Sequence, residues 1–339
     1  MSAFTKLILE GRHLTAEESR QAMAAIMSNG LPPVTVAAFL TALRMKGEHV
    51  DEIVGAARAM REHATAVRHH QTLLLDTCGT GGDHSNTFNI STTAAFVVAA
   101  GGVPVGKHGN RAASSRSGSA DLLEALGANI ALDEHQVGQC IDTVGIGFMF
   151  APRLHPAMKH VAPVRKELGF RTIFNLLGPL CNPAGATHQI IGVFHPDYLA
   201  PMARAAGDLG TPGTMVVHNM TGIDELAPLG ENRVATYRDG EVELTSISAV
   251  DCGLNDCARS DLAGGDAAEN ARITRDIFEG RSGAKSDTVA MNAGLAFLNA
   301  GVVPNLKVGV QFARDLMAGG KAKTKLDEFI SYTRSQGNA

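Results

Sequence analysis

Between residues 72 and 218, short apolar runs alternate with longer stretches of helical character, and few folds accommodate such a pattern. The runs typical of strands are 72–76, 103–107, 146–150, 188–194 and 214–218. Helices are expected between them, near 91–101, 119–126, 134–144 and 197–209. Alternation of this kind favours a parallel sheet flanked by helices. We therefore predict an α/β fold with a mostly parallel sheet, then a hairpin at Asp239-Gly240 and mostly helix from about residue 267.

The first seventy residues lack this alternation and read as helical. Thr15 and Glu18 form a capping box at the start of one helix, which we expect to end at Gly30. Pro33 suits the first turn of a second helix that ends near Gly47, and a third helix follows. A unit of this kind buries an apolar stripe within itself or against a partner subunit.

A later segment, 156–178, interrupts the alternation and reads as two successive helices, about 156–169 and 172–177. We expect this segment to rejoin the N-terminal helices in space. The predicted organisation is a smaller all-helical domain of residues 1–71 plus about 156–185, and a large α/β domain of residues 72–155 plus 186–339.

The composition is that of an ordinary globular protein, with 45% hydrophobic and 19% charged residues. A net charge of −4 argues against a broad nucleic-acid surface, and no apolar stretch is long enough to span a membrane. The N-terminus lacks the pattern of a signal peptide. Five scattered cysteines fit reduced thiols, and Cys252 and Cys257 have no second pair to complete a zinc site. We expect a cytoplasmic protein that binds neither nucleic acid nor membranes.

The segment Gly79-Thr80-Gly81-Gly82-Asp83 lies between a predicted strand and a predicted helix. That order makes a cradle of backbone N–H groups for an anion, because glycine lets the backbone approach a phosphate closely. Asn89, Ser91 and Thr92 add an amide and two hydroxyls at the expected helix start, which suit phosphate oxygens or a phosphate-bound metal. A plain tight turn is the alternative for the glycines, and an N-cap is the alternative for Ser91. Together they favour a phosphate-bearing substrate.

A second polar segment, Lys107-His108-Gly109-Asn110-Arg111, follows the next predicted strand. We expect the Lys107 ammonium to emerge at the carboxyl end of that strand, where ligands bind in open α/β sheets. A solvated surface lysine is the alternative. Ser119 begins the next helix and supplies a second helix N-terminus. Two such termini suit a substrate that carries phosphate at both ends.

Asp224 and Glu225 follow the predicted strand 214–218. Adjacent carboxylates there are hard oxygen ligands for Mg²⁺, which usually also takes substrate phosphates, although an isolated acidic pair is more often solvated charge.

Arg165 lies on the first helix of the inserted segment, and its planar guanidinium suits the carboxylate of a small organic acid. No Ser-His-Asp or Cys-His arrangement is evident, so no nucleophile or redox cofactor is required.

The glycine segment, the Lys107 segment with Ser119, the stretch from Arg165 to Pro179, and Asp224-Glu225 together resemble the anthranilate phosphoribosyltransferase family of tryptophan biosynthesis. The resemblance spans nearly the whole chain. It implies a fold of the nucleoside phosphorylase and phosphoribosyltransferase type, with a homodimer formed through the helical domain. It also implies transfer of the phosphoribosyl group of phosphoribosyl pyrophosphate (PRPP) to the amine of anthranilate, with release of pyrophosphate by a Mg²⁺-dependent in-line displacement.

The same resemblance implies roles for individual residues. The expected PRPP contacts are Gly79, Thr80, Gly81, Gly82, Asp83, Thr87, Asn89, Ser91, Thr92, Lys107 and Ser119. The expected anthranilate contacts are Gly79, His108, Asn110, His155, Arg165 and Pro179. The expected ligands of two Mg²⁺ ions are Ser91, Asp224 and Glu225. No acid or base is implied, because Lys107 and Arg165 act by alignment and by stabilising the leaving group.

The sequence departs from the family pattern at two places. His84 stands where glycine is common, and Asn219-Met220-Thr221 replaces a glycine-led turn. Two other functions stay open. A pyrimidine nucleoside phosphorylase of the same fold class uses inorganic phosphate and does not need Asp224-Glu225, whereas a nucleic-acid-binding relative would lack Asn110 and Arg165 and carry a basic groove.

Overall fold

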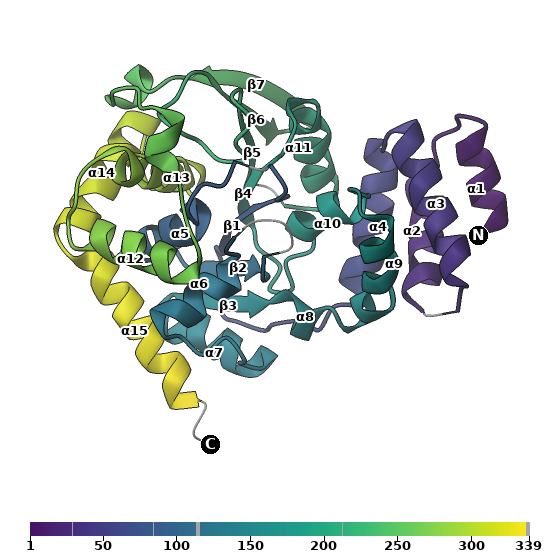
Figure 1. Ribbon diagram of the computed structural model, residues 1–339, viewed down its shortest axis with the longest axis horizontal. Helices are drawn as coiled ribbons and strands as arrows, with labels where there is room; N and C mark the ends of the chain where they lie inside the picture. Colours follow the sequence, from purple (N-terminus) through teal and green to yellow (C-terminus); the bar gives the residue numbers. More distant parts are fainter. Residues whose placement is uncertain (29, 84, 113–115, 212, 337–339) are drawn as a thin grey trace.

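A large lobe built around one twisted sheet adjoins a small helical lobe that carries the N-terminus (Figure 1). The coordinates are a computed structural model, which describes residues 1–28, 30–83, 85–112, 116–211 and 213–336. His84, one of the two departures from the family pattern, lies outside the described residues. Among the helices of the described ranges, none is both long and apolar enough to cross a membrane.

The large lobe contains a seven-stranded sheet in the order β3-β2-β1-β4-β5-β6-β7. The strands are β1 (Leu75–Gly79), β2 (Val105–Gly109), β3 (Ile146–Phe150), β4 (His188–Gly192), β5 (Gly213–Asn219), β6 (Asn232–Arg238) and β7 (Glu241–Ile247). The strands from β3 to β5 in this order pair in parallel, and β6 and β7 add antiparallel pairs. The predicted mostly parallel sheet and its hairpin are therefore confirmed. Asp239 and Gly240 have φ of 49° and 88°, as a two-residue hairpin turn requires.

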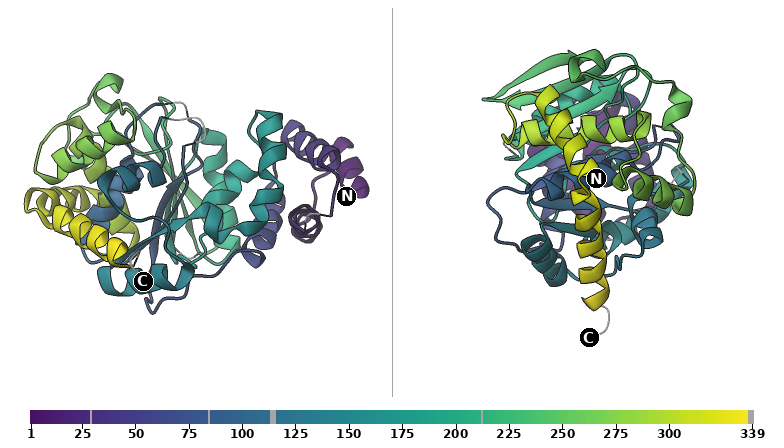
Figure 2. Two further views of the ribbon diagram at one scale, coloured as in Figure 1. Left: turned by 60° about the horizontal axis from the view of Figure 1, so that its bottom comes forward. Right: turned by 90° about the vertical axis from the view of Figure 1, so that its left-hand side faces the viewer.

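Helices cover both faces of the sheet (Figure 2). One face packs against α5 (Ile90–Ala100), α6 (Ser119–Leu126), α12 (Ala267–Phe278), α13 (Ala284–Asn299), α14 (Leu306–Ala318) and α15 (Lys321–Ser335). The other face packs against α11 (Leu199–Asp208) and the small lobe, while α7 (Glu134–Val144) lies on β3. Side chains alternate between the two cores, so Ile190 faces the first and Ile191 the second.

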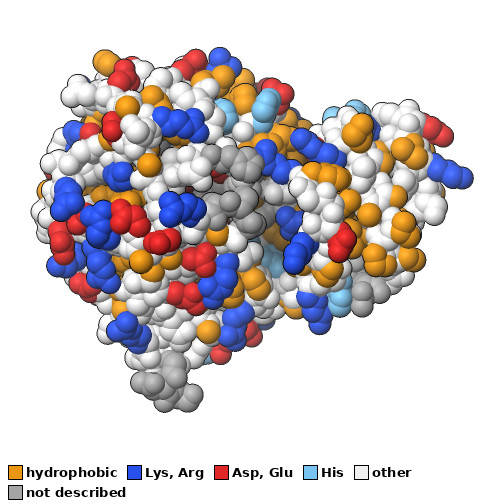
Figure 3. Space-filling model, in the orientation of Figure 1, with side chains coloured by type: hydrophobic (Ala, Val, Ile, Leu, Met, Phe, Trp, Pro, Cys, Tyr) orange, Lys and Arg blue, Asp and Glu red, His pale blue; other side chains and the backbone are white. Residues whose placement is uncertain are grey.

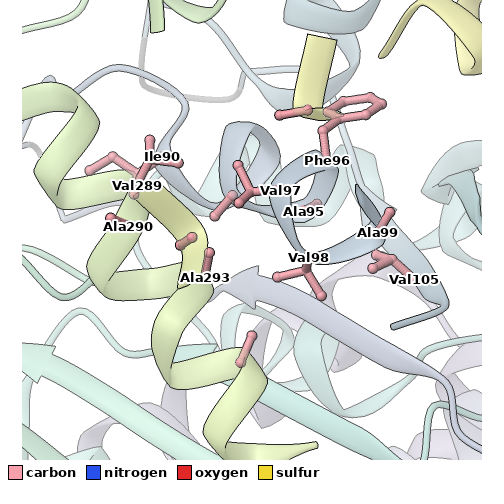
Figure 4. Close-up of a cluster of buried hydrophobic side chains, with 14 of the residues drawn as sticks. Ile90, Ala95, Phe96, Val97, Val98, Ala99, Val105, Val289, Ala290 and Ala293 are labelled. Carbon is pink, nitrogen blue, oxygen red and sulfur yellow. The ribbon is translucent and has the colours of Figure 1, made fainter. Parts of the chain in front are cut away.

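The helix that follows the glycine segment is held rigidly. Figure 4 shows α5 against α13, with Ile90 and Val97 near Ala290 and Ala293. Every residue of α5 except Ser91 and the last one, Ala100, is buried, so the helix is packed on nearly every side. Because it cannot rotate or slide in this packing, its N-terminus has a fixed direction.

Strands β1 and β2 begin three and two residues later than the apolar runs predicted. Gly79 and Lys107 are therefore strand residues, and Gly79 pairs with Gly192 of β4. Strand limits depend on backbone pairing with a neighbour, which extends past the last apolar side chain. The glycine loop proper begins at Thr80.

The small lobe contains α1 (Ser2–Leu9), α2 (Ala16–Met27), α3 (Pro33–Lys46) and α4 (Val50–Glu62). Both hydrogen bonds of the predicted capping box at Thr15 form, and Pro33 begins α3. The predicted end of α2 at Gly30 is wrong: the helix ends at Met27 and Ser28 caps it.

The inserted segment packs against this lobe, with α9 (Ala162–Leu168) on α3 and α10 (Phe174–Leu180) on α4. The helix predicted over 156–169 is instead a 3₁₀ turn, Pro156–His160, followed by α9. Pro163 lacks the N–H that a continuous helix would need in that turn. The second predicted helix begins at Phe174 and runs to Leu180, so Pro179 lies inside it rather than after it. The turn that precedes the segment is α8 (Ala151–Leu154).

Candidate active site

One cavity of about 630 Å³ lies at the carboxyl ends of β1 and β2, where the sheet meets the inserted helices. Figure 3 shows Lys and Arg side chains gathered along the border between the two lobes. Every residue that the sequence assigned to a substrate or metal lines this cavity. They are Gly79, Thr80, Gly81, Gly82, Asp83, Thr87, Asn89, Ser91, Thr92, Lys107, His108, Asn110, Ser119, His155, Arg165, Pro179, Asp224 and Glu225.

The glycine segment lies directly against the acidic pair. The Gly81 N–H donates to Asp224 Oδ2 at 3.1 Å, and a Cβ on Gly79 would lie only 2.5 Å from the same oxygen. Gly81 and Gly82 have φ of 66° and 73°, which favours glycine at both positions. The Thr80 hydroxyl accepts from the backbone N–H of Phe194 at 3.1 Å, which ties the loop to the end of β4. The loop is thus a constrained turn whose residues line the cavity.

The N-terminus of α5 opens into the same cavity. Asn89 occupies the N-cap position, but its side chain makes no capping hydrogen bond. Ser91 lies inside the helix, so the N-cap interpretation of Ser91 is wrong. Its backbone N–H donates to Glu225 Oε1 at 3.2 Å. A carboxylate at this position complements the positive end of the helix dipole.

Three carboxylates converge here. Asp83 Oδ2 accepts from the backbone N–H of Asp224 at 3.3 Å. Burial raises the pKa of Asp224 well above its ordinary range, and the neighbouring Asp83 and Glu225 add to the shift. Burial also raises the pKa of Glu225 to about 7, against the opposing effect of Lys107. Such crowding of partly buried carboxylates, which Lys107 offsets only in part, favours a bound cation.

This donor set suits Mg²⁺, which prefers oxygen ligands and keeps positions for substrate phosphates. Within the described ranges, no three His, Cys, Asp or Glu side chains are arranged to hold a metal by themselves. A bound ion therefore needs further oxygens, such as the Ser91 hydroxyl and the phosphates of a substrate.

Lys107 lies elsewhere than predicted. It is a mid-strand residue, only 4% exposed, and its Nζ donates to the backbone carbonyl of Thr77. Its ammonium thus lies against β1 rather than past the strand end, because β2 continues to Gly109, two residues beyond the predicted run. Burial raises the pKa of Asp76, and the nearby Lys107 ammonium opposes that rise. Lys107 still lines the cavity and is a fixed positive charge at its floor.

The opposite wall of the cavity combines neutral rings with one cation. Arg165 lies on α9 with its guanidinium 5.4 Å from the centre of the Phe174 ring. Burial lowers the pKa of Arg165, and the described residues place no carboxylate in an ion pair with it. A largely buried guanidinium without an anion is poised to bind one.

His108 and His155 form the neutral part of this wall, with ring centres 5.0 Å apart. Burial lowers the pKa of His108 to about 3 and that of His155 to about 4, so both are uncharged at neutral pH. His108 Nε2 and both ring nitrogens of His155 have no hydrogen-bond partner among the described residues. The pair therefore makes this part of the wall neutral and aromatic.

The remaining predicted residues connect the two walls. Asn110 donates its backbone N–H to Ser119 Oγ at 3.2 Å, which joins the end of β2 to the start of α6. The carbonyl of Pro179 accepts from Gln189 Nε2 at 2.7 Å, which fixes α10 to β4.

The turn at Asn219 supports the acidic pair despite its unusual sequence. Asn219 is fully buried, and its side-chain amide donates to the carbonyl of Leu229 at 2.7 Å. Its Oδ1 accepts from the Thr221 backbone N–H at 2.9 Å. The asparagine thus closes the loop that carries Asp224-Glu225, a role that a glycine-led turn would leave to the backbone.

Sequence reasoning missed several residues of this region. Met60, Met158, Lys159 and Asn175 line the cavity from the small lobe and the inserted segment. Asn182 donates to Asp76 Oδ2 and to the Gly106 carbonyl, both at 2.8 Å, and so joins β1 to β2. None of them stands in a local pattern that identifies it, because each reaches the site only through tertiary packing.

Two family models match the chain, and their descriptions agree with this architecture. Residues 2–64 match the helical bundle domain of a glycosyl transferase family, and residues 71–323 match its a/b domain. The fold and cavity therefore define a glycosyltransferase with a helical bundle beside an α/β domain. The anthranilate phosphoribosyltransferase of Symbiobacterium thermophilum is 50% identical over 333 residues, which cover 98% of each chain.

Solved structures give the same result. Anthranilate phosphoribosyltransferase from Thermus thermophilus has a TM-score of 0.93 and 48% identity, over 98% of this chain and 99% of that one. The Saccharomyces cerevisiae enzyme in complex with PRPP and Mg has a TM-score of 0.89 and 30% identity, over 98% and 97% of the two chains. This chain belongs to the anthranilate phosphoribosyltransferase family, as its sequence motifs indicated.

Proposed function

We propose that this protein transfers the phosphoribosyl group of PRPP to the amine of anthranilate and releases pyrophosphate, a step of tryptophan biosynthesis. The observation that carries the proposal is the single cavity described above. It joins partly buried carboxylates and two helix N-termini on one side to neutral rings and an arginine with no anionic partner among the described residues on the other. The first side suits a diphosphate with its metal, and the second suits an aromatic acid. Structures of the yeast enzyme in complex with PRPP and Mg, and in complex with 4-fluoroanthranilate, support both assignments.

The chain's own residues account for alignment and for stabilisation of the leaving group. The glycine-loop N–H groups and Lys107 provide positive potential where pyrophosphate develops negative charge. Arg165 binds the carboxylate of anthranilate and so directs its amine toward the ribose carbon, on the face opposite the departing diphosphate. The aromatic amine is uncharged at neutral pH, and His108 and His155 are neutral as well, so no general base is required. The reaction is an in-line displacement with inversion.

We assign Ser91, Asp224 and Glu225 as the residues that hold Mg²⁺, with two ions per chain. When bound, Mg²⁺ neutralises the diphosphate and makes it a better leaving group. Two ions fit because the diphosphate offers two phosphates and the acidic pair offers carboxylates on two adjacent residues. Calorimetric titration of Mg²⁺ in the presence of PRPP measures the number of bound ions per chain. A stoichiometry of one would contradict the assignment of two.

The decisive assay follows the fluorescence of anthranilate. With PRPP and Mg²⁺ present, we expect the fluorescence to fall as the product forms, and to stay constant when EDTA or buffer replaces the metal or the donor. The same preparation with thymidine or uridine and inorganic phosphate is the control, and we expect no phosphorolysis. Phosphorolysis without loss of anthranilate would instead favour the nucleoside phosphorylase.

We further propose that the protein is a homodimer formed through its helical lobe. Three large apolar side chains are exposed there: Leu9 by 73%, Val34 by 74% and Met45 by 82%. Exposed apolar groups of this kind are typical of subunit contacts. Sedimentation should give twice the 35.5 kDa of one chain, and Val34→Lys with Met45→Lys should give one chain. Leu244→Lys, at an exposed apolar position of β7, is the control and should leave the mass unchanged.

We also propose that residues 1–71 and 156–185 form one domain and the rest the other, since α9 and α10 pack on α3 and α4. Limited proteolysis that separates the inserted segment from the N-terminal helices would contradict this division.

A cytoplasmic location fits the five free cysteines, which persist as thiols in a reducing compartment. Co-fractionation with a cytoplasmic marker tests it.

A further inference from the structure

A segment far along the chain supports the PRPP side of the cavity without lining it. Residues 262–265 pair with residues 86–88, which follow the glycine loop. Thr87 and Ala263 form an antiparallel bridge, and the Gly264 N–H donates to the Asn86 carbonyl at 2.9 Å. A Cβ on Gly264 would lie 2.6 Å from Phe88 Cα, so the two backbones touch. The loop entering α5 is therefore held by the segment that enters α12.

Two buried polar pairs extend this contact along the helices. Asn270 Nδ2 donates to Asn89 Oδ1 at 2.9 Å, and the Thr274 and Thr93 hydroxyls are 3.0 Å apart. Thr93 is four residues after Asn89, and Thr274 is four residues after Asn270. The two pairs therefore lie about one helical turn apart. Asn270 is 2% exposed and Thr274 is 1% exposed. Buried polar groups of this kind are costly unless paired, so each pair specifies how α5 and α12 align.

The hydrogen bonds determine which way each amide points. The backbone N–H of Gly265 can only donate, and it donates to Asn270 Oδ1 at 2.8 Å. The NH₂ group of Asn270 must therefore face Asn89, which in turn must present its oxygen. That leaves the NH₂ group of Asn89 to face Ser117, where it donates to the backbone carbonyl at 3.0 Å. The orientation of Asn89 is thus fixed from two sides: Asn270, held by Gly265, donates to its oxygen, and Ser117 accepts from its NH₂ group while the Ser117 hydroxyl donates to the same oxygen at 3.2 Å.

Asn89 and Ser117 both line the cavity, whereas Asn270 does not. Ser117 precedes α6, so the Asn89 amide joins the starts of two helices that face the cavity. Because this amide is turned toward Ser117 and Asn270, it does not cap α5, and the positive end of that helix stays open to an anion. Within the described residues, Asn89 Nδ2 uses one of its two hydrogens, so one remains for a ligand.

We propose that Asn270 is a positioning residue for the PRPP site, which acts by fixing the orientation of the Asn89 amide and the spacing of the α5 and α6 N-termini. The proposal rests on the proposed function, since it concerns the same donor. It assigns a role to α12 that no pattern in the sequence indicates.

Asn270→Asp and Asn270→Ala distinguish orientation from packing. The aspartate keeps the shape and the bond from Gly265 but offers Asn89 only an oxygen. The Asn89 amide then either opposes that oxygen with its own or reverses and loses both of its bonds with Ser117. The alanine merely removes one bond. We expect Asn270→Asp to raise the KM for PRPP by at least about tenfold, equivalent to ~1.4 kcal/mol, and Asn270→Ala to raise it less. The KM for anthranilate should stay within about twofold of wild type. A packing role predicts the opposite order, because the aspartate is nearly isosteric.

Thr274→Val is the matched control, since it breaks the second pair one turn away at equal burial. We expect it to lower the melting temperature without changing the KM for PRPP. If Asn270→Asp does not fold, a double-mutant cycle of Asn270→Ala with Asn89→Ala gives the same information. Calorimetric Kd values for PRPP with Mg²⁺ should then be non-additive, the double variant resembling Asn89→Ala.

Each outcome has one meaning. Three results would overturn the role of Asn270 while wild-type activity still supports the proposed function. They are an unchanged KM for PRPP in both Asn270 variants, equal increases in the KM of both substrates, and additive Kd values in the double-mutant cycle. A wild-type protein that neither binds PRPP nor consumes anthranilate would overturn the proposed function and this inference with it.

Discussion

Replacing Arg165 with alanine should raise the KM for anthranilate by about 100-fold, while the KM for PRPP changes by less than about threefold. The guanidinium is largely buried, stacks on Phe174 and has no anionic partner among the described residues. A charge-assisted hydrogen bond contributes about 1.5–3 kcal/mol, and a bidentate pair in a buried site lies at the upper end of that range or above it. Because the proposed PRPP site lies at the other wall of the cavity, the affinity for PRPP should hardly respond. Steady-state kinetics with each substrate varied in turn measures both values.

Lys166→Ala is the control for Arg165→Ala. Lys166 is the next residue on α9, but it is exposed and does not line the cavity. The Lys166→Ala substitution removes one positive charge from the same helix, so a purely long-range electrostatic effect on the KM would appear in both variants. Equal changes in the KM of the two substrates after Arg165→Ala would reject the carboxylate-binding role. Arg165→Lys should recover part of the affinity, since the ammonium keeps the charge but not the bidentate geometry.

Glu225→Gln should lower kcat/KM for PRPP by about 10³-fold and, at the same time, stabilise the metal-free protein. The first effect follows because the variant loses a metal ligand and with it about 4 kcal/mol of transition-state stabilisation. The second follows because the variant removes a buried negative charge next to Asp224 and Asp83. Activity at several Mg²⁺ concentrations measures the first effect, and thermal unfolding in EDTA measures the second.

The pH dependence of this stability has a definite sign. Burial raises the pKa of Glu225 in the folded protein to about 7, from 4.5 when exposed. Between these values the folded protein binds more protons than the unfolded one, so its stability falls as the pH rises. In EDTA, the wild-type melting temperature should therefore drop between pH 5 and pH 8 by more than that of Glu225→Gln, and Mg²⁺ with PRPP should restore it at pH 8.

Glu231→Gln is the control for the acidic pair. Glu231 belongs to the same region of chain after β5, but it is exposed and paired with Arg233. We expect this variant to keep both the activity and the pH profile of wild type. A Glu225→Gln enzyme with full Mg²⁺-dependent activity would contradict the metal assignment. A wild-type melting temperature that rises from pH 5 to pH 8 in EDTA would contradict the raised pKa.

Local patterns in the sequence were sufficient for most of the fold. The strand-helix alternation, the capping box at Thr15 and the Asp239-Gly240 turn are all confirmed, because each depends on neighbours within a few residues. Element ends were less predictable. The strands β1 and β2 extend past their apolar runs, since a ladder continues wherever the partner backbone is available. The proline in α9 divided a helix that apolar spacing alone had made continuous.

The chemistry of single residues shows the same division. The residue types pointed to binding of a diphosphate, a divalent cation and a small acid, and all of these residues line the cavity. Their environments depend on burial. Lys107 was expected at a strand end but lies mid-strand and donates to the Thr77 carbonyl of β1, and Ser91 was a possible cap but leaves that position to Asn89. Burial also makes His108 and His155 neutral, which the sequence does not reveal.

The sequence by itself determined the class of fold, the order of the binding segments and the family, because these depend on residue types at short spacing. Only the tertiary structure decided how those segments meet: which carboxylates share one pocket, which arginine has no anionic partner among the described residues, and that Asn270, 181 residues from Asn89, donates to its side-chain oxygen. The physical reason is that protonation, unpaired charge and amide orientation depend on every group within a few ångströms, and folding brings those groups together from distant parts of the chain.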